Sequence, residues 1–209
     1  MARLAAWLEE LGIPVVATSE PDGSPLGAWV RAALAERSLE PLTECFLFAT
    51  ARAEHVRRVI RPALEREAVV LCDRYADSTV VYQGYGRGVP LDVVAELNRL
   101  ATDGLVPDLT LVLDLDAGEG LRRARGRTVR PPAAADPREA GAPRGLAAEG
   151  LDPFERLGLE FHERVRKGYR ALHEREPERV ELVDAAWPEA AVAAAIRAIV
   201  SARFRVGGP

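Results

Sequence analysis

Short apolar runs alternate with longer segments of helical periodicity along this chain. Four of the runs are almost continuously apolar, which is typical of parallel strands that are buried on both faces. They cover residues 14–18, 68–72, 109–115 and 180–183. Apolar residues recur at helical spacing in residues 2–12, 26–34, 42–66, 91–102, 119–125, 153–174 and 188–203. Strands that alternate with helices predict an α/β fold, with a parallel sheet and helices on both faces.

Composition narrows the class of protein. The 209 residues, 48% of them hydrophobic, suffice for one compact domain spanning residues 1–209. The formal net charge of −4 argues against a nucleic-acid partner, because nucleic-acid binders usually carry a strongly basic face. No apolar run is long enough to cross a bilayer and no secretory signal opens the chain, so we expect a cytoplasmic protein without a membrane partner. Cys45 and Cys72 lie in apolar contexts and are expected to be buried, reduced thiols.

One stretch breaks the alternation of strands and helices. Residues 131–150, PPAAADPREAGAPRGLAAEG, are mostly proline, alanine and glycine, which offer few side chains to bury. We expect an irregular loop that orders only over a bound ligand. Because only residues 151–209 follow it, we interpret it as a loop within the domain and not as a linker between domains.

The strongest chemical signal directly follows the second predicted strand. Residues 73–88, DRYADSTVVYQGYGRG, combine a carboxylate, two arginines, hydroxyls, an amide and glycines at a strand end, where open α/β sheets bind ligands. Arg74 and Arg87 can each hold an anion with a planar guanidinium group, and the glycines let the backbone approach a ligand closely. Composition alone leaves a flexible polar loop with one helix N-cap equally open.

This string resembles the signature DR(Y/H)xxSxxAYQGxGRG of bacterial thymidylate kinases. It matches at Asp73, Arg74, Tyr75, Ser78, Tyr82, Gln83, Gly84, Gly86, Arg87 and Gly88, with Val81 in place of the signature alanine. The resemblance extends over nearly the whole chain: FLFATARAEHV (residues 46–56) is similar to the family's LLFAADRAQHV, and PDLTLVLDL (residues 107–115) to its PDLTLLLDL. Residues 152–169 are similar to its DRFE…F…VR.GY segment.

The resemblance implies a kinase that transfers a phosphoryl group from ATP to dTMP, giving ADP and dTDP for dTTP biosynthesis, with Mg²⁺ as cofactor. It implies a homodimer with the P-loop-kinase-like fold. In such a site Phe48 stacks on thymine and Arg52 hydrogen-bonds it, although the spacing of Phe48 alone fits a core residue equally well. The implied phosphate ligand is Arg74, and Asp73 would lie near the transferred phosphate and Mg²⁺, which makes both catalytic. The residues implied to face base and sugar are Ser78, Thr79, Tyr82 and Gln83.

A second region of resemblance is SEPDGS, residues 19–24, which is similar to the family's REPGGT. The family's arginine and glutamate reach toward phosphates, which implies a phosphate-region role for Glu20. Ser19 replaces the arginine and Asp22 replaces a glycine, and both changes should weaken anion binding. We favour an ordinary Pro-Asp-Gly turn as the description of this segment.

A third region is an arginine-rich run that leads into the proline- and alanine-rich loop. The resemblance implies that residues 126–151 form the LID that closes over ATP, with arginines that neutralise the transferred phosphoryl group. A solvated basic helix face is an equally good interpretation, since the family's Asp-Arg is Asp152-Pro153 here. The candidate LID arginines are Arg122, Arg123, Arg125, Arg127 and Arg130.

One expected motif does not occur in the sequence. A cradle for ATP phosphates usually has the form GxxxxGK[ST], and the 209 residues contain no such string. The family places it after its first, central strand, so the resemblance implies four of five family strands here. The alternative to the enzyme is therefore a non-catalytic dTMP-binding remnant or an N-terminally truncated, inactive form, for which we expect no significant turnover.

The resemblance to the family also makes a structural prediction. Residues 68–72 and 109–115 would flank the absent central strand. Closing that space would require the covering helices to shift by several ångströms, which close-packed layers resist. We therefore expect two separate pairs, residues 14–18 with 68–72 and residues 109–115 with 180–183.

Overall fold

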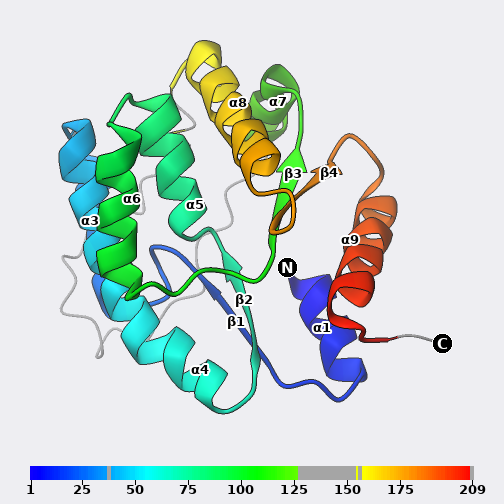
Figure 1. The fold of residues 1–209 in the computed structure, drawn as a ribbon. Coiled ribbons are helices and arrows are strands. Elements are labelled where there is room, and N and C mark those ends of the chain that lie inside the picture. Colours follow the sequence, from blue (N-terminus) through cyan, green and yellow to red (C-terminus); the bar gives the residue numbers. More distant parts are fainter. Residues whose placement is uncertain (37–38, 127–153, 155–156, 208–209) are drawn as a thin grey trace.

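The computed structural model describes residues 1–36, 39–126, 154 and 157–207, and Figure 1 shows their arrangement. All four predicted strands are present, and no strand end differs from the prediction by more than one residue. The first half of the chain forms α1 (Ala2–Glu10), β1 (Val15–Ser19), α2 (Pro25–Glu36), α3 (Pro41–His55), the π-helical turn η1 (Val56–Ile60), α4 (Arg61–Glu65) and β2 (Val69–Asp73). The second half forms α5 (Ala76–Thr79), the π-helical segment η2 (Val80–Gly86), α6 (Leu91–Thr102), β3 (Thr110–Asp114), α7 (Ala117–Gly126), α8 (Leu159–Arg175), β4 (Val180–Asp184) and α9 (Glu189–Phe204).

The strands form two separate parallel pairs. β1 pairs with β2, from Val15 opposite Val69 to Ser19 opposite Asp73. β3 pairs with β4 over Thr110–Asp114 and Val180–Asp184. Within the described part of the chain, β2 and β3 share no ladder, which confirms the prediction of two pairs.

Backbone directions show which residues of β2 and β3 lack a strand partner on one side. The Val69 N–H donates to the Pro14 carbonyl and the Asp73 carbonyl accepts from Glu20, so alternate residues of β2 bond to β1. Successive residues of a strand direct their backbone groups to opposite sides, so Val70 and Cys72 direct theirs away from β1. By the same alternation, Leu111 and Leu113 of β3 direct theirs away from β4, because Thr110 donates to Arg179 and Asp114 accepts from Ala185.

Amide hydrogen exchange should report this alternation. In the 209-residue chain we expect the amides of Val70 and Cys72 to exchange faster than those of Val69 and Leu71 in the same strand, because only the latter donate to β1. Residue-resolved exchange measured by NMR checks this. The residues of the strand that donate to β1 serve as the control for those that do not. Equal protection of alternate residues in β2 would show that a partner covers the second edge.

Three segments differ from the sequence predictions. Composition left a flexible polar loop open for residues 76–86, but these residues are helical. Here η2 packs tightly against α8: a methyl group added at Gly86 would lie 2.6 Å from Phe161 Cε2. The helix predicted over residues 153–174 begins at Leu159, after Gly158 in an extended conformation. Gly126, assigned to the LID-like loop of residues 126–151, is the last residue of α7. The rest of that loop up to residue 151, and with it the prediction for residues 131–150, lies outside the described residues.

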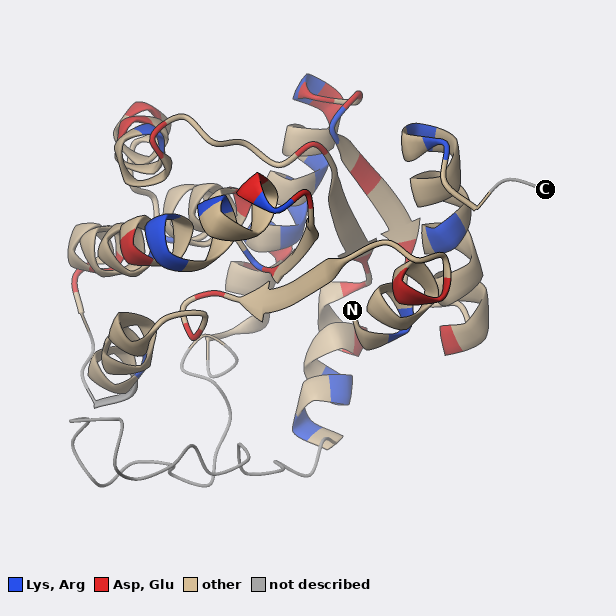
Figure 2. Ribbon diagram, turned by 90° about the horizontal axis from the view of Figure 1, so that it is seen from below, with Lys and Arg blue, Asp and Glu red and all other residues tan. Residues whose placement is uncertain are grey.

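Helices and one ion pair connect the two strand pairs. α8 packs on both η2 and β4, through a core of Val81, Phe161, Val165 and Leu172. Arg179, which precedes β4, binds Asp77 of α5 through two hydrogen bonds of 2.7 and 2.9 Å. α1 packs on β1 and on α9, and Figure 1 shows this pair on the opposite side of the strands from α3 and α6. Charged residues lie mainly on the helices and at strand ends (Figure 2).

None of the described helices is both long and apolar enough to cross a membrane.

Candidate functional site

A pocket that is open to solvent lies beyond the carboxyl ends of β1 and β2. Residues from the turn after β1, from α3 and from the α5–η2 segment line it. The structure thus brings together eight residues that the sequence predicted: Glu20, Phe48, Arg52, Arg74, Ser78, Thr79, Tyr82 and Gln83.

Aromatic rings form one wall of this pocket. Phe48 of α3 is half-buried, and its ring lies 6.2 Å from that of Phe154. Tyr82 of η2 meets Phe154 edge to face, with ring centroids 5.5 Å apart. Phe154 was not predicted as a site residue, although it lies in the DPFERLGL stretch that resembles the family. Phe48 is therefore a partly exposed residue of the pocket lining and not a fully buried core residue.

The Arg52 guanidinium is held by buried polar side chains. Its Nε and Nη2 donate to the same oxygen of Glu20, at 2.8 and 2.7 Å, and its side chain is only 2% exposed. Nη1 donates to Asn98 Oδ1 at 2.7 Å, and Nη2 also donates to Thr79 Oγ1 at 3.1 Å. These contacts leave one N–H of Nη1 to be donated elsewhere. Asn98 was missed, because a single asparagine on a helix gives no local signal of what it meets.

The second oxygen of Glu20 faces His55. His55 Nδ1 lies 3.2 Å from Glu20 Oε1, and its Nε2 lies 2.7 Å from Thr18 Oγ1. Glu20 is thus buried among Arg52 and His55, and its implied role toward phosphates remains a prediction. The surrounding segment is a turn, as favoured from the sequence, and Asp22 pairs with Arg31 at 2.7 Å.

Arg74 lies at the mouth of the pocket. It directly follows β2 and adopts φ 67°, a left-handed conformation that costs a non-glycine residue about 1–2 kcal/mol. Such outliers cluster at binding and catalytic sites. The Arg74 guanidinium carbon lies 4.7 Å from the centre of the Tyr82 ring, and the residue is exposed. Asp73, the last residue of β2, is exposed beside it.

Hydroxyl and amide groups complete the lining. Ser78 Oγ lies 3.2 Å from the Tyr169 hydroxyl, and burial raises the pKa of Tyr169 to about 12, which keeps this phenol protonated at neutral pH. The Gln83 side chain is almost fully buried, and its Nε2 donates to Glu44 at 3.2 Å.

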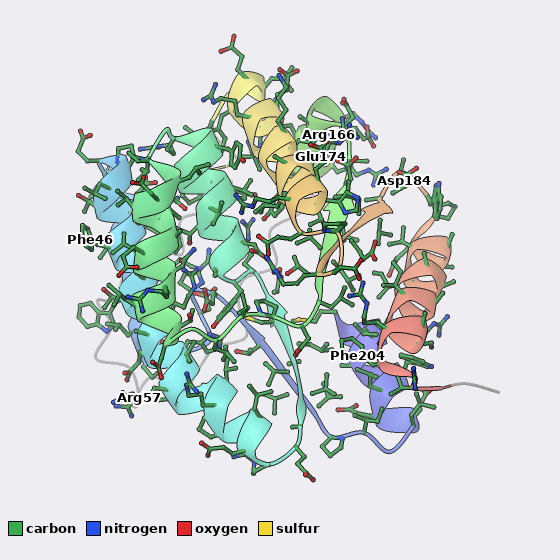
Figure 3. The ribbon with its side chains drawn as sticks, in the orientation of Figure 1. Phe46, Arg57, Arg166, Glu174, Asp184 and Phe204 are labelled. Atoms are coloured by element: carbon green, nitrogen blue, oxygen red, sulfur yellow. The ribbon has the colours of Figure 1, made fainter. Side chains whose placement is uncertain are left out.

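A second cavity adjoins the first, because Arg74 and Tyr82 line both. Its other walls come from the carboxyl end of β3 and from α7 and α8. Hydrogen bonds from Arg166 and Arg170 lower the pKa of Asp114, at this strand end, to about 2. Figure 3 shows Arg166 and Asp184 at this end of the β3–β4 pair.

Several other candidate residues have side-chain partners in the described part of the chain. Arg122 and Arg123 each bind Glu119 at 2.7 Å, and neither these two nor Arg125 lines either cavity. Arg127 and Arg130 lie outside the described residues. Arg87, considered as an anion ligand, binds Glu44 and the Leu39 carbonyl. Cys45 is buried and Cys72 only half-buried; burial raises the pKa of Cys72 to about 12, so its thiol stays protonated.

Comparison with known proteins gives a consistent result. A family model described as thymidylate kinase matches residues 1–196. A thymidylate kinase of Desulfovibrio desulfuricans is 47% identical over 208 residues, which cover 98% of this chain and 89% of that protein. One of Deinococcus radiodurans is 43% identical, over 97% of this chain and 89% of that protein. The crystal structure of thymidylate kinase from Ehrlichia chaffeensis superimposes with a TM-score of 0.68 at 28% identity, and the match covers 94% of this chain and 87% of that one.

Proposed function

This chain belongs to the thymidylate kinase family, and we propose that the pocket beside β1 and β2 is where it holds dTMP. The family reaction is the transfer of a phosphoryl group from ATP to dTMP, which gives dTDP. The enzyme is favoured over a non-catalytic remnant, because relatives that match nearly the whole chain are thymidylate kinases. One observation carries the assignment: an aromatic wall, a buried arginine and an exposed arginine meet at one pocket.

The pocket suits a flat base with a phosphate at one end. Phe48 offers a ring face on which a pyrimidine can stack, and such stacking contributes about 1–3 kcal/mol per base. Arg52 offers its remaining N–H to a base oxygen. Arg74 at the mouth offers a charged, planar donor group that suits the phosphate. Because Arg74 also lines the second cavity, we infer that the phosphoryl group is transferred at this junction.

We further propose that Mg²⁺ accompanies ATP and that Asp73 contributes a carboxylate to it. Protein sites for Mg²⁺ commonly use one or two carboxylates together with substrate phosphates and waters. The described residues contain no cluster of three or more metal-binding side chains, which is compatible with such a site. Bound Mg²⁺ would neutralise charge on the phosphates. Turnover should be lost when a chelator removes the metal ion and should return when Mg²⁺ is added. Measuring both rates checks this proposal. We assign no residue to the ATP phosphates, because the 209 residues contain no GxxxxGK[ST] string.

Replacing Phe48 by alanine should weaken dTMP binding by about 1–3 kcal/mol, the usual effect of removing a stacked ring. Isothermal titration calorimetry measures the change. Phe204→Ala is the control, because Phe204 is an exposed phenylalanine at the end of α9, far from the pocket (Figure 3). An unchanged dTMP affinity in Phe48→Ala would show that the base does not stack on Phe48.

A homodimer is also proposed, and an exposed apolar surface supports it. Trp29 of α2 and Phe46 of α3 are 48% and 53% exposed, and Leu42, one helical turn before Phe46 on α3, is exposed as well. The helices α2 and α3 pack together. In Figure 3 Phe46 points away from the molecule. Exposed apolar groups on adjacent helices often mark a protein interface. Phe46→Asp should shift sedimentation from dimer to monomer, and a wild-type protein that sediments as a monomer would contradict the proposal.

The cytoplasmic location and the absence of nucleic-acid and membrane partners remain predictions from the sequence.

A further inference from the structure

Glu44 is a buried carboxylate that the proposed site does not yet use. It lies on α3, is 5% exposed, and faces η2. Its Oε2 accepts a hydrogen bond from Gln83 Nε2, and its Oε1 pairs with Arg87 Nη2, both at 3.2 Å. Burial raises the pKa of Glu44 above its ordinary value, and the hydrogen bond from Gln83 and the charge of Arg87 offset this only in part. A buried carboxylate is retained only where such partners compensate its desolvation.

This contact determines which way the Gln83 amide faces. A glutamine amide carries two donors on its nitrogen and an acceptor oxygen on the other side, and the two flipped orientations have nearly the same shape. An ionised carboxylate only accepts hydrogen bonds, so the Gln83 NH₂ group must face Glu44. A flipped amide would place the Gln83 oxygen against the carboxylate oxygen of Glu44, and the two would repel each other. Because Gln83 also lines the pocket, its oxygen is the atom left to accept a hydrogen bond from a bound base.

Two other polar groups of the pocket lining are donors. Arg52 is locked by Glu20 and Asn98, with one N–H left to donate. Thr79 Oγ1 accepts from Arg52, so the hydroxyl proton of Thr79 is left for another acceptor. These donors, together with the acceptor oxygen of Gln83, match a pyrimidine with a carbonyl at position 4 and an N–H at position 3. A 4-aminopyrimidine such as cytosine presents the reverse pattern.

We propose that Glu44 is a positioning residue that makes this pocket select a 4-oxopyrimidine over a 4-aminopyrimidine, by holding the Gln83 amide oxygen toward the base. The proposal rests on the proposed function, namely that the pocket binds dTMP. Glu44 acts through Gln83 and does not itself touch the base.

The test compares the affinities for dTMP and dCMP by calorimetry. In Glu44→Met the amide can flip, so we expect the ratio of Kd for dCMP to Kd for dTMP to fall about tenfold or more, the value of one hydrogen bond. Arg87→Lys is the matched control. It disturbs the other ion pair of Glu44 and keeps a positive charge there, and it should change the ratio by less than about twofold.

The outcomes separate the two proposals. If Glu44→Met weakens dTMP and dCMP binding by the same factor, Glu44 is only structural and the proposal is overturned. If wild-type protein binds no dTMP, the proposed function fails instead. Should Glu44→Met not fold, as judged by circular dichroism, Gln83→Met takes its place: it removes the acceptor oxygen and should lower the same ratio. An unchanged ratio in Gln83→Met equally overturns the proposal.

Discussion

Replacing Arg52 by methionine should destabilise the folded protein by about 3–5 kcal/mol, the usual cost of breaking a buried ion pair from one side. Methionine fills much of the same space, so the main loss is the charge. Glu20, 4% exposed, would lose both guanidinium hydrogen bonds, and its other oxygen would still face His55 Nδ1 at 3.2 Å. Binding of dTMP should also become undetectable, because Arg52 is the proposed donor to the base.

Denaturant unfolding and calorimetry measure the two effects separately. The double variant Arg52→Met, Glu20→Gln should recover much of the stability, since no uncompensated charge remains, but none of the dTMP affinity. If Arg52→Met alone lowers the free energy of unfolding by less than about 1 kcal/mol, the result would contradict the stabilising role of the buried network. A double variant that binds dTMP normally would exclude Arg52 from the base site.

Replacing Arg74 by alanine should weaken dTMP binding by about 2 kcal/mol or more, roughly 30-fold, because a charge-assisted contact to the phosphate is lost. The effect on stability should be small, since Arg74 is exposed and alanine adopts its left-handed conformation at a similar cost. Arg74→Ala should therefore weaken dTMP binding with little effect on stability, whereas Arg52→Met should reduce both.

The strands were predictable because their signal is local. Val69–Asp73 and Thr110–Asp114 are short apolar runs, and their separation into two pairs followed from the missing phosphate-loop string. The helical course of residues 76–86 was missed because glycine, threonine and tyrosine are weak helix formers. It depends on a neighbour distant in sequence, Phe161 of α8, which lies against Gly86.

Within the site, the sequence indicated many of the residues that line the pocket, but not the neighbours that hold them in place. Phe48, Arg52 and Arg74 belong to strings that resemble a family. Asn98 is a single polar residue on a helix, 46 residues from its partner Arg52 in the sequence. His55 lies in one of those strings, but its partner Glu20 is 35 residues away. Such contacts exist only once the elements have packed, so no local pattern encodes them.

The central claim is that the pocket beside β1 and β2 holds dTMP, with Arg74 on its phosphate. Calorimetric titration of wild-type protein and Arg74→Ala with dTMP and with thymidine tests it most directly, because the two ligands differ only in the phosphate. We predict that wild-type protein binds dTMP more tightly than thymidine. Arg74→Ala should lose most of that difference and bind thymidine as the wild type does. Equal losses for both ligands, or no dTMP binding by the wild-type protein, would contradict the account.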